Sequence, residues 1–272
     1  MDFIIRAIRF TRAYFIGLSA RRTYRQWLKN KPDTMAPISR DDWPESLKNP
    51  TDFYARCFYQ YHLCLPQELH EHRQYFSHHR RGFGEDAFHT MWYMLFEEFR
   101  PAQFLEIGVY RGQTISLASL LQRILKIEGS VTGISPFTSV GDSVSKYSTQ
   151  VNYLSDTLEN FRHFHLPEPK LCREYSTAPA AIEMIASREW DCIYIDGCHD
   201  YEVAKEDWKN CSAHVRKGGI IVMDDSALAT SYHPPKFASK GHPGPSRLMQ
   251  EIDGNAFEEI LQVGHNRVFQ KK

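Results

Sequence analysis

The sequence of 272 residues has no net charge, no paired cysteine motif and no long apolar run. Lys plus Arg and Asp plus Glu both number 33, so the overall charge gives no reason to expect a dedicated nucleic-acid-binding protein. The six cysteines lack C-x-x-C spacing, which favours neither a zinc site nor a disulfide framework and fits a reducing, cytoplasmic location. No stretch approaches the ~20 apolar residues of a membrane span, and the start lacks a signal-peptide core followed by a cleavage site.

Charge is nevertheless unevenly distributed. Residues 1–31 carry eight basic side chains and one acid, a local charge of +7. Within them, residues 3–16 show helical spacing of apolar side chains flanked by arginines. Such a basic amphipathic helix can lie on an anionic membrane surface. The alternative, which we favour, is a helix that docks on its own domain or on a second subunit of a homo-oligomer.

The chain divides into two parts at about residue 85. Residues 32–84 are rich in proline and polar residues, which predicts connecting segments and irregular helix. Residues 85–99 follow with the pattern of an amphipathic helix that stops before Pro101. We therefore expect a basic, helical N-terminal extension over residues 1–84 and a catalytic or binding domain over residues 85–272.

From residue 103 onward, predicted strands alternate with predicted helices. The strands are expected at 103–109, 130–137, 191–197 and 220–226, and the helices at 114–129, 176–190 and 201–219. This alternation predicts an α/β fold in which a doubly wound, mostly parallel sheet carries helices on both faces. Residues 256–270 break the rhythm and predict an antiparallel hairpin that closes the sheet.

The stretch "FLEIGVYRGQT" lies where the first strand meets its helix. Gly108 and Gly112 would let a ligand approach the backbone there, and the helix start offers free N–H groups. Glu106 precedes the glycines. A carboxylate in this place would repel a pyrophosphate, but it suits a ligand that carries a cationic amino or sulfonium group.

A second group of polar residues follows two later strands, in "YIDGCHDYEVAKEDW" and "GGIIVMDDSA". Asp196, Asp224 and Asp225 end neighbouring parallel strands, so we expect them to face one crevice. Clustered carboxylates repel one another unless a hard cation such as Mg²⁺ or protons neutralise them. His199 follows Asp196 closely and is suited to take a proton from a hydroxyl. The alternative is structural: Asp196 and Asp200 would cap the following helix, and the other two aspartates would form a polar turn.

These motifs resemble the class I S-adenosylmethionine-dependent methyltransferases. Over residues 85–272 they look most like the branch of macrocin O-methyltransferase and the cephalosporin hydroxylase-like proteins. The resemblance implies a seven-stranded sheet, S-adenosylmethionine as cofactor, His199 as catalytic base and a divalent cation on Asp196, Asp224 and Asp225. The cofactor-binding residues expected with it are Glu106, Gly108, Gly112, Thr114, Ser135, Ser176 and Asp196.

One position departs from the family pattern. Ser135 stands where the family has an acidic residue for the ribose hydroxyls, and a neutral hydrogen bond is roughly half as strong as a charge-assisted one. Ser135 can also be read as a turn residue before Pro136. Ser176 or Thr177, after the third strand, is the candidate neighbour of the adenine.

Two loops are candidates for a lid over the crevice, residues 141–147 and 232–247. The second offers four side chains that would either contact an acceptor or lie in solvent: His233, Lys236, His242 and Arg247. The histidines at 70, 72, 78 and 79 lie among arginines, so we expect a solvated or acceptor-binding surface there and no metal site. Trp92, Tyr93, Leu95 and Phe96 are predicted to be core residues.

The predicted function is metal-assisted O-methylation of a hydroxyl on a sugar or small metabolite. A hydroxyl is preferred because a metal has little to do for an acceptor that is already nucleophilic, such as an amine. Two alternatives remain open from the sequence: a hydroxylase-like relative with the same fold, and a non-catalytic binding or scaffold protein. The clustered carboxylates argue against a scaffold, since their mutual repulsion is costly.

Overall fold

The computed structural model describes residues 17–78 and 81–272. The predicted amphipathic stretch at residues 3–16 and the histidine at 79 lie outside this described part. The first described element is a helix that ends at residue 29. Among the described residues, no helix has the length and apolarity that crossing a membrane would require.

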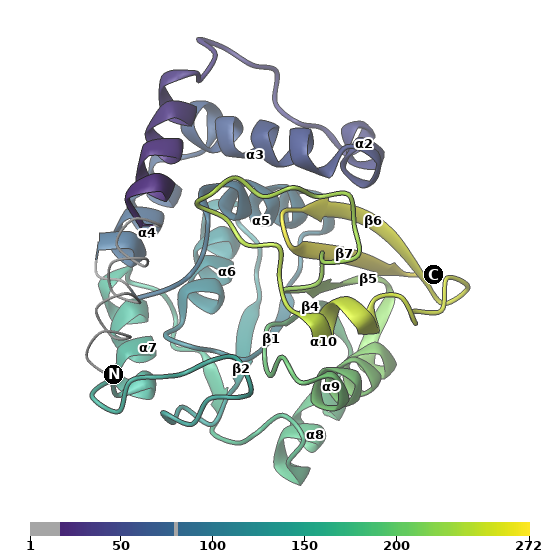
Figure 1. The fold of residues 1–272 in the computed structure, drawn as a ribbon. Coiled ribbons are helices and arrows are strands. Elements are labelled where there is room, and N and C mark those ends of the chain that lie inside the picture. The colour runs from purple at the N-terminus through teal and green to yellow at the C-terminus, as the bar shows by residue number, and fades with distance from the viewer. Residues whose placement is uncertain (1–16, 79–80) are drawn as a thin grey trace, which may run out of the picture.

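The strands and helices alternate as predicted from residue 103 onward (Figure 1). In chain order the strands are β1 (Gln103–Ile107), β2 (Ser130–Ile134), β3 (Lys170–Cys172), β4 (Trp190–Ile195), β5 (Val215–Met223), β6 (Phe257–Val263) and β7 (Asn266–Lys271). The helices after the first are η1 (Arg40–Asp42, a 3₁₀ turn), α2 (Trp43–Lys48), α3 (Pro50–Cys64), α4 (Gln67–His78), α5 (Asp86–Phe99), α6 (Gln113–Ile124), α7 (Tyr153–His163), α8 (Pro179–Ala186), α9 (Tyr201–His214) and α10 (Pro243–Leu248).

One seven-stranded sheet forms the centre of the domain, with the strand order β3-β2-β1-β4-β5-β7-β6. The first five strands in this order pair in parallel, whereas β7 runs antiparallel to both β5 and β6. The β6–β7 hairpin turns at Gly264, whose φ of 61° is in the left-handed region that glycine tolerates best. The predicted doubly wound, mostly parallel sheet with a closing antiparallel hairpin is therefore confirmed.

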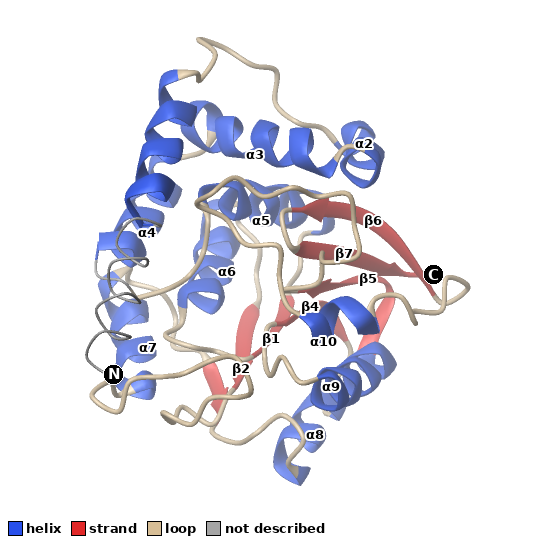
Figure 2. Cartoon of the chain, in the orientation of Figure 1, coloured by secondary structure: helices blue, strands red, loops and turns tan. Residues whose placement is uncertain are grey.

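Helices cover both faces of this sheet, and each face has its own apolar core. One core joins α3, α5 and α6 to alternate residues of the strands, including Phe104, Tyr194 and Val222. The other joins α8, α9 and α10 to the opposite strand face, including Ile193 and Ile221. Long loops leave the carboxyl ends of β2 and β5 (Figure 2), and these loops border the site described below.

The segment at residues 32–84 is more regular than predicted. It contains α2, α3 and α4, and α3 packs along α5 as part of the main core. The prolines misled the prediction because they stand at helix starts: Pro44 and Pro50 occupy the first positions of α2 and α3. Proline is favoured there, since its missing N–H has no helical partner at that position anyway. The boundary at residue 85 stays a prediction.

The helix over residues 17–29 docks on its own domain, whereas the prediction for the amphipathic helix at residues 3–16 falls outside the described residues. Tyr24, Trp27 and Leu28 pack against the main core, and the Tyr24 hydroxyl donates a hydrogen bond of 2.6 Å to Asp86. Trp27 also meets Phe237 of the long loop edge-to-face, with ring centroids 5.3 Å apart. The opposite face is exposed and basic, and its members are Arg21, Arg22, Arg25 and Lys29.

The predicted core residues of α5 are placed as expected, but one predicted surface residue is not. Trp92, Leu95 and Phe96 are buried, and Tyr93 is half-buried. His72 was expected on a solvated surface, yet it is completely buried. Its ring packs against Phe76 and Phe164 and is hydrogen-bonded on both nitrogens, while the adjacent Arg73 pairs with Asp86.

Candidate functional site

Three strand ends, those of β1, β4 and β5, meet at one edge of the sheet. In register, Ile107 of β1 pairs with Ile195 of β4, which pairs with Met223 of β5. The strand pairing continues for one residue beyond these ends. The N–H of Asp196 donates to the Ile107 carbonyl at 2.8 Å, and the N–H of Asp224 donates to the Ile195 carbonyl at 3.0 Å. The predicted convergence of the strand-end aspartates follows from this pairing.

Asp225 is held in an unusual backbone conformation. Its φ of 50° lies in the left-handed region, which is strained for a residue with a side chain. The loop after β5 folds back on it: the N–H of His242 donates to the Asp225 carbonyl at 2.8 Å, and Ser226 forms a β-bridge with Gly241. The fold therefore fixes the direction of this carboxylate through contacts on both sides of the loop.

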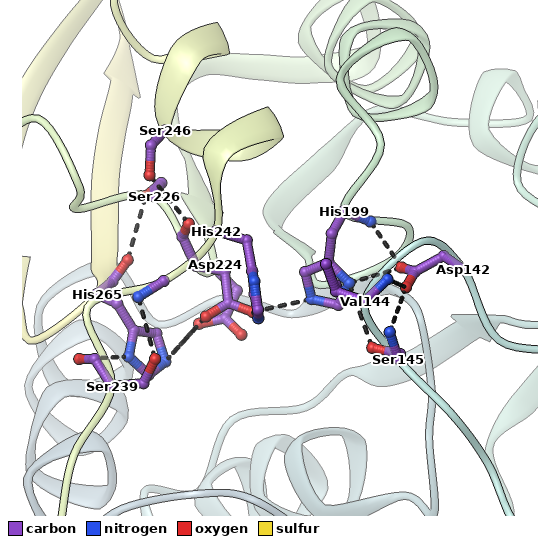
Figure 3. Close-up of polar contacts among 12 residues, drawn as sticks. Asp142, Val144, Ser145, His199, Asp224, Ser226, Ser239, His242, Ser246 and His265 are labelled. Atoms are coloured by element: carbon purple, nitrogen blue, oxygen red, sulfur yellow. Dashed lines mark hydrogen bonds and ion pairs between the residues drawn. The ribbon is translucent and has the colours of Figure 1, made fainter.

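His265, in the turn of the β6–β7 hairpin, reaches the same edge. Its Nε2 lies 3.2 Å from an Asp224 oxygen and 3.8 Å from an Asp225 oxygen, and its Nδ1 faces the Ser239 carbonyl at 3.2 Å (Figure 3). Both ring nitrogens thus face acceptors. Burial lowers the pKa of His265, but Asp224 outweighs it and raises this pKa to about 10. The residue is a buried imidazolium that the sequence analysis did not single out.

His199 lies between two carboxylates. Its Nδ1 is 2.6 Å from an oxygen of Asp142, and its Nε2 is 2.9 Å from an oxygen of Asp225. Figure 3 shows the Asp142 side of this arrangement. Burial opposes protonation, but the hydrogen bonds with Asp225 and Asp142 raise the pKa of His199 to about 9. In this arrangement both ring nitrogens donate at neutral pH.

Asp196 and Asp224 behave as an unequal pair. Burial, followed by the charge of Asp224, raises the pKa of Asp196 well above its ordinary value, so its carboxyl group is protonated. Burial also pushes the pKa of Asp224 upward, but His265 outweighs it and holds this pKa at about 2. The predicted repulsion among the carboxylates is thus relieved by one proton and two imidazolium rings.

Two sets of side chains within the described residues lie close enough together to be candidate metal ligands. Ligand atoms of Asp224, Asp225 and His265 lie within 4.8 Å of one another, as do those of His199, Asp225 and His242. Asp196 belongs to neither set. The structure therefore joins two of the three predicted ligands and adds histidines to them.

Glu106 is buried beside this edge with an unsatisfied oxygen. Its side chain is 3% exposed, and Oε2 makes no hydrogen bond within the described structure. Burial raises the pKa of Glu106 to about 8; the Ile115 amide opposes this shift and Asp224 adds to it. A buried oxygen without a partner is costly, and a cationic group placed against it would remove that cost.

The two glycines of the first motif have structural reasons to be glycine. Both have positive φ angles, 95° for Gly108 and 79° for Gly112. A Cβ on Gly108 would come within 1.9 Å of the Asp196 carbonyl oxygen, and one on Gly112 would come within 2.8 Å of the Thr157 side chain. The β1–α6 turn therefore needs glycine to let β4 and α7 approach, whether or not a ligand lies there.

The remaining predicted cofactor residues surround the same edge. Thr114 lies in the first turn of α6, Ser135 follows β2, and Ser176 follows β3; all three are half-buried. The Ser135 N–H donates to the Cys172 carbonyl at 3.1 Å, so its main chain has a structural role. The helix-cap alternative gains little support, because Asp200 occupies the N-cap of α9 without a capping hydrogen bond from its side chain.

The two loops predicted as a lid behave differently. Residues 141–147 close onto the turn after β4, where Ser143 donates to Asp200 in addition to the Asp142 contact. The cavity left between Asp196, His199, Asp225 and Pro245 is about 10 Å³, room for a single water molecule. From the other loop, His242 reaches the site, with its ring centroid 4.4 Å from that of His199.

The other polar residues of that second loop point elsewhere. His233 bonds its own loop at the Ser231 carbonyl, and Lys236 donates to Ser19 of the first helix. The Arg247 guanidinium lies over the Tyr201 ring, 3.8 Å from its centroid. These three side chains are fastened to the protein surface, whereas His242 is part of the site.

Comparison with known proteins gives a family match and structures that share the fold. Residues 105–226 match a family described as a methyltransferase domain. An O-methyltransferase from Bacillus cereus, solved with S-adenosylhomocysteine, is 14% identical; the match covers 81% of this chain and 99% of that one, with a TM-score of 0.53. A protein from Staphylococcus aureus assigned as a caffeoyl-CoA O-methyltransferase is 11% identical over 76% of this chain and 93% of that one, with a TM-score of 0.51. At such identities these structures share the fold.

A viral protein is also similar in sequence. It is an uncharacterised protein of Acanthamoeba polyphaga mimivirus, 22% identical over 156 residues, which are 57% of this chain and 62% of that protein. The chain thus spans less than two thirds of this relative. Residues 105–226 thus match the methyltransferase-domain family, and the sheet that they help to form has the fold of the two structures above.

Proposed function

We propose that this chain transfers the methyl group of S-adenosylmethionine to a hydroxyl of a sugar or other small metabolite, with a divalent cation at the strand-end carboxylates. The observation that carries the proposal is the position of His199. A histidine that becomes a base once it loses one proton lies at the carboxyl edge of the sheet, within the matched methyltransferase domain and beside half-buried carboxylates.

The first-motif residues fit a cofactor with a positively charged methionine end. The unsatisfied Oε2 of Glu106 is the feature that tests this fit, because only a donor or a cation can satisfy it. Glu106 would hold the amino group, while the half-buried Ser135 and Ser176 would border the ribose and adenine. Serine at 135 offers a neutral hydrogen bond, so we expect that contact to contribute less than a carboxylate would.

A divalent cation also fits the donor atoms at this edge. Asp224, Asp225 and His265 would hold it, with Asp196 beside Asp224. A set that mixes carboxylate oxygen with imidazole nitrogen suits Mn²⁺ or Fe²⁺ as well as Mg²⁺, which strongly prefers oxygen. Binding requires His265 to lose its proton, so the affinity for metal would rise with pH.

The chemistry that the bound groups supply is an electrophilic methyl group and a lowered pKa of the acceptor hydroxyl. His199 takes the hydroxyl proton, the oxygen forms a bond to the methyl carbon, and the carbon–sulfur bond breaks with its electron pair left on sulfur. A base must be neutral, and both nitrogens of His199 now face carboxylates. One of these two contacts therefore has to open before the reaction.

Space for an acceptor also requires movement. The cavity beside His199 holds only a single water molecule, so residues 141–147 must open to admit a substrate. A hydroxylase-like reaction on the same fold, and a non-catalytic scaffold, are the two other candidates. The imidazolium–carboxylate cluster favours an enzyme, because pairing buried charges is costly and structural stability alone does not require it.

Calorimetric titration of S-adenosylmethionine into the metal-stripped protein tests this proposal first. It is repeated with Mg²⁺ and Mn²⁺ and with the variants Asp196→Asn and Asp224→Asn. We expect saturable cofactor binding by the wild type and a loss of metal binding in Asp224→Asn. The holo protein is then screened for transfer of a radiolabelled methyl group to sugars and phenols.

Each outcome decides between the candidates. Methyl transfer to a hydroxyl supports the proposal, and oxygenated product without methyl transfer would establish the hydroxylase-like alternative. Cofactor binding with no transfer to any acceptor favours a binding protein. No cofactor binding, with or without metal, would overturn the proposal altogether.

We extend the proposal to the surroundings of the enzyme. The exposed basic face of the first helix, with Arg21, Arg22 and Arg25, is suited to peripheral contact with an anionic membrane, while the helix stays docked through Trp27. Sedimentation with vesicles of neutral or anionic lipid measures this contact, and equal binding to both would count against it. A cytoplasmic location and a homo-oligomeric state remain predictions from the sequence.

A further inference from the structure

Asp142, in the loop after β2, holds His199 by two hydrogen bonds. One oxygen, Oδ2, accepts the main-chain N–H of His199 at 2.9 Å and the ring Nδ1–H at 2.6 Å. The other oxygen, Oδ1, accepts the amides of Val144 and Ser145 at 3.0 and 2.6 Å. The carboxylate is therefore fixed within its own loop, and in turn it fixes both ends of the histidine.

The charge of Asp142 suits this position. Burial pushes the pKa of Asp142 upward, but the amides of His199 and Ser145 outweigh it and hold the pKa well below its usual range. The side chain is 9% exposed, so solvent screens the contact weakly. A permanent carboxylate against Nδ1 keeps the proton on that nitrogen when the ring is neutral, and the lone pair then lies on Nε2.

The two carboxylates that flank His199 differ in what else they contact. Asp225, on the Nε2 side, also has His265 at 3.8 Å and His242 at 3.7 Å, and it lies among the candidate metal ligands. Asp142 contacts no second cationic side chain in the described part of the chain. The contact that can open for an acceptor is thus the one at Nε2, which faces the strand-end cavity.

We propose that Asp142 is the positioning residue of His199: it keeps the proton on Nδ1 and turns Nε2 toward the acceptor hydroxyl. This role rests on the proposed methyl transfer and deepens it, since it names the nitrogen that takes the proton. It also links the base to the loop, because His199 is oriented only while residues 141–147 are closed. A buried aspartate on the far nitrogen of a catalytic histidine has the same orienting role in hydrolase triads.

The test compares Asp142→Asn with Ser143→Ala. The first variant keeps the shape of the side chain and removes its charge. The second removes the neighbouring contact between the loop and Asp200 without touching the imidazole, so it is a matched control for simple loosening of the loop. Asp142→Glu is the conservative variant that restores the charge.

Two measurements distinguish a role of Asp142 in orienting the His199 ring from a role only in stabilising the loop. The first is proton NMR of the ligand-free protein, in which an imidazole N–H bonded to a carboxylate at 2.6 Å gives a resonance downfield of the amides. We expect this resonance in the wild type and in Ser143→Ala and its loss in Asp142→Asn. The second is the kinetics of methyl transfer, where Asp142→Asn should lower kcat on the order of 100-fold or more with little change in KM.

The outcomes are distinguishable from those of the proposed function. Partial recovery of kcat in Asp142→Glu, with kcat near the wild-type value in Ser143→Ala, supports the positioning role. An unchanged kcat in Asp142→Asn overturns it, as does equal loss of kcat in Ser143→Ala. If the wild type transfers no methyl group although the downfield resonance is present, the proposed function and this role both fail while the contact itself stands.

Discussion

Two pairs of largely buried histidines in this protein differ in charge, one pair being neutral and the other positive. His72 of α4 and His89 of α5 meet where the His72 Nδ1 is 3.1 Å from the His89 Nε2, and the other His72 nitrogen bonds the Ser116 hydroxyl. Burial lowers the pKa of His72 well below its ordinary value and that of His89 to about 3. At the strand ends, the pKa values of His199 and His265 are instead raised, to about 9 and about 10.

The difference comes from neighbours and not from burial. All four rings are largely removed from water, which disfavours the charged form. Only His199 and His265 have carboxylates within hydrogen-bonding reach that outweigh this cost. A buried histidine therefore indicates chemistry only where the sheet edge brings acids to it, and one beneath a helix is a packing residue.

Replacing one histidine of each pair should separate catalysis from stability, and the largest expected effect is on catalysis. His199→Ala should lower the rate of methyl transfer by about 10²–10⁴-fold, because the general base is lost. It should also lower the free energy of unfolding at neutral pH, because two carboxylates lose their cationic partner. His72→Ala should lower stability by about 2–4 kcal/mol but leave the folded fraction active. Initial rates and urea unfolding of both variants measure this. Similar activity losses in the two would contradict it.

Glu106 gives the next largest effect, on cofactor affinity. Its pKa of about 8 means that the free protein holds a proton there at pH 6, which a cationic ligand must expel. The affinity of the wild type for S-adenosylmethionine should therefore rise between pH 6 and pH 8. In Glu106→Gln we expect a loss of roughly 10–100-fold at pH 8 and little pH dependence, since a charged hydrogen bond contributes about 1.5–3 kcal/mol.

Calorimetry in buffers of different ionisation enthalpy checks this prediction directly. Proton release on binding at pH 7 should occur in the wild type and disappear in Glu106→Gln. Binding without proton release would place the cofactor amino group elsewhere.

The two histidine pairs should also give opposite pH dependence of stability. His72 and His89 have depressed pKa values, so the unfolded state binds more protons and stability falls as pH drops below about 6.5. His199 and His265 have raised values, so their stabilisation is complete below about 6.5 and is lost as pH rises through 9 to 10. Urea unfolding of the wild type and of His72→Gln at pH 5, 7 and 9.5 separates them. The variant should lose less stability than the wild type between pH 7 and 5, by about 1–2 kcal/mol.

The smallest effect is expected at a buried carboxyl group that no imidazole contacts. It extends the comparison of buried groups with and without a charged partner. Asp207 of α9 is fully buried beneath the β4 end with neither oxygen hydrogen-bonded, and burial raises its pKa to about 7. Its neutral form is favoured in the folded state, so stability is lost as pH rises from about 4 through 7. Asp207→Asn should be more stable than the wild type by about 1 kcal/mol at pH 8 and equal to it at pH 4. Equal unfolding free energies at pH 8 would show that a hydrogen-bond donor such as Ser176 satisfies the carboxylate.

Most of the sheet could be predicted from the sequence because its strands are short, apolar and bounded by glycine or polar residues. The C-terminal hairpin was predicted with them, and its turn lies at Gly264. The extension was correctly predicted to be helical, but its helices were expected to be irregular, since prolines such as Pro50 were taken as breakers when they start helices. Helix α7 was omitted because the long loop before it obscured its start at Asn152, whose side chain caps the helix.

The site was predictable only where it follows from strand ends. Asp196, Asp224 and Asp225 converge because parallel strands end at one edge, a rule that needs no tertiary detail. His265 could have been found by placing the turn of the predicted hairpin beside the strand it extends. Asp142 could not, because it meets His199 across 57 residues through the path of an irregular loop that no local pattern encodes.

His265, the residue that pairs with Asp224, lies in the hairpin between β6 and β7 and is therefore one of the last parts of the chain to be synthesised. The carboxylates after β4 and β5 leave the ribosome before the turn that carries His265, so a nascent chain holds these acids with His199 but without His265. Docking the hairpin buries apolar residues such as Val268 and at the same moment neutralises the sheet edge. Docking of this hairpin therefore completes the fold and the candidate site in one step. A chain whose synthesis stopped before residue 265 would lack the imidazole that pairs with Asp224.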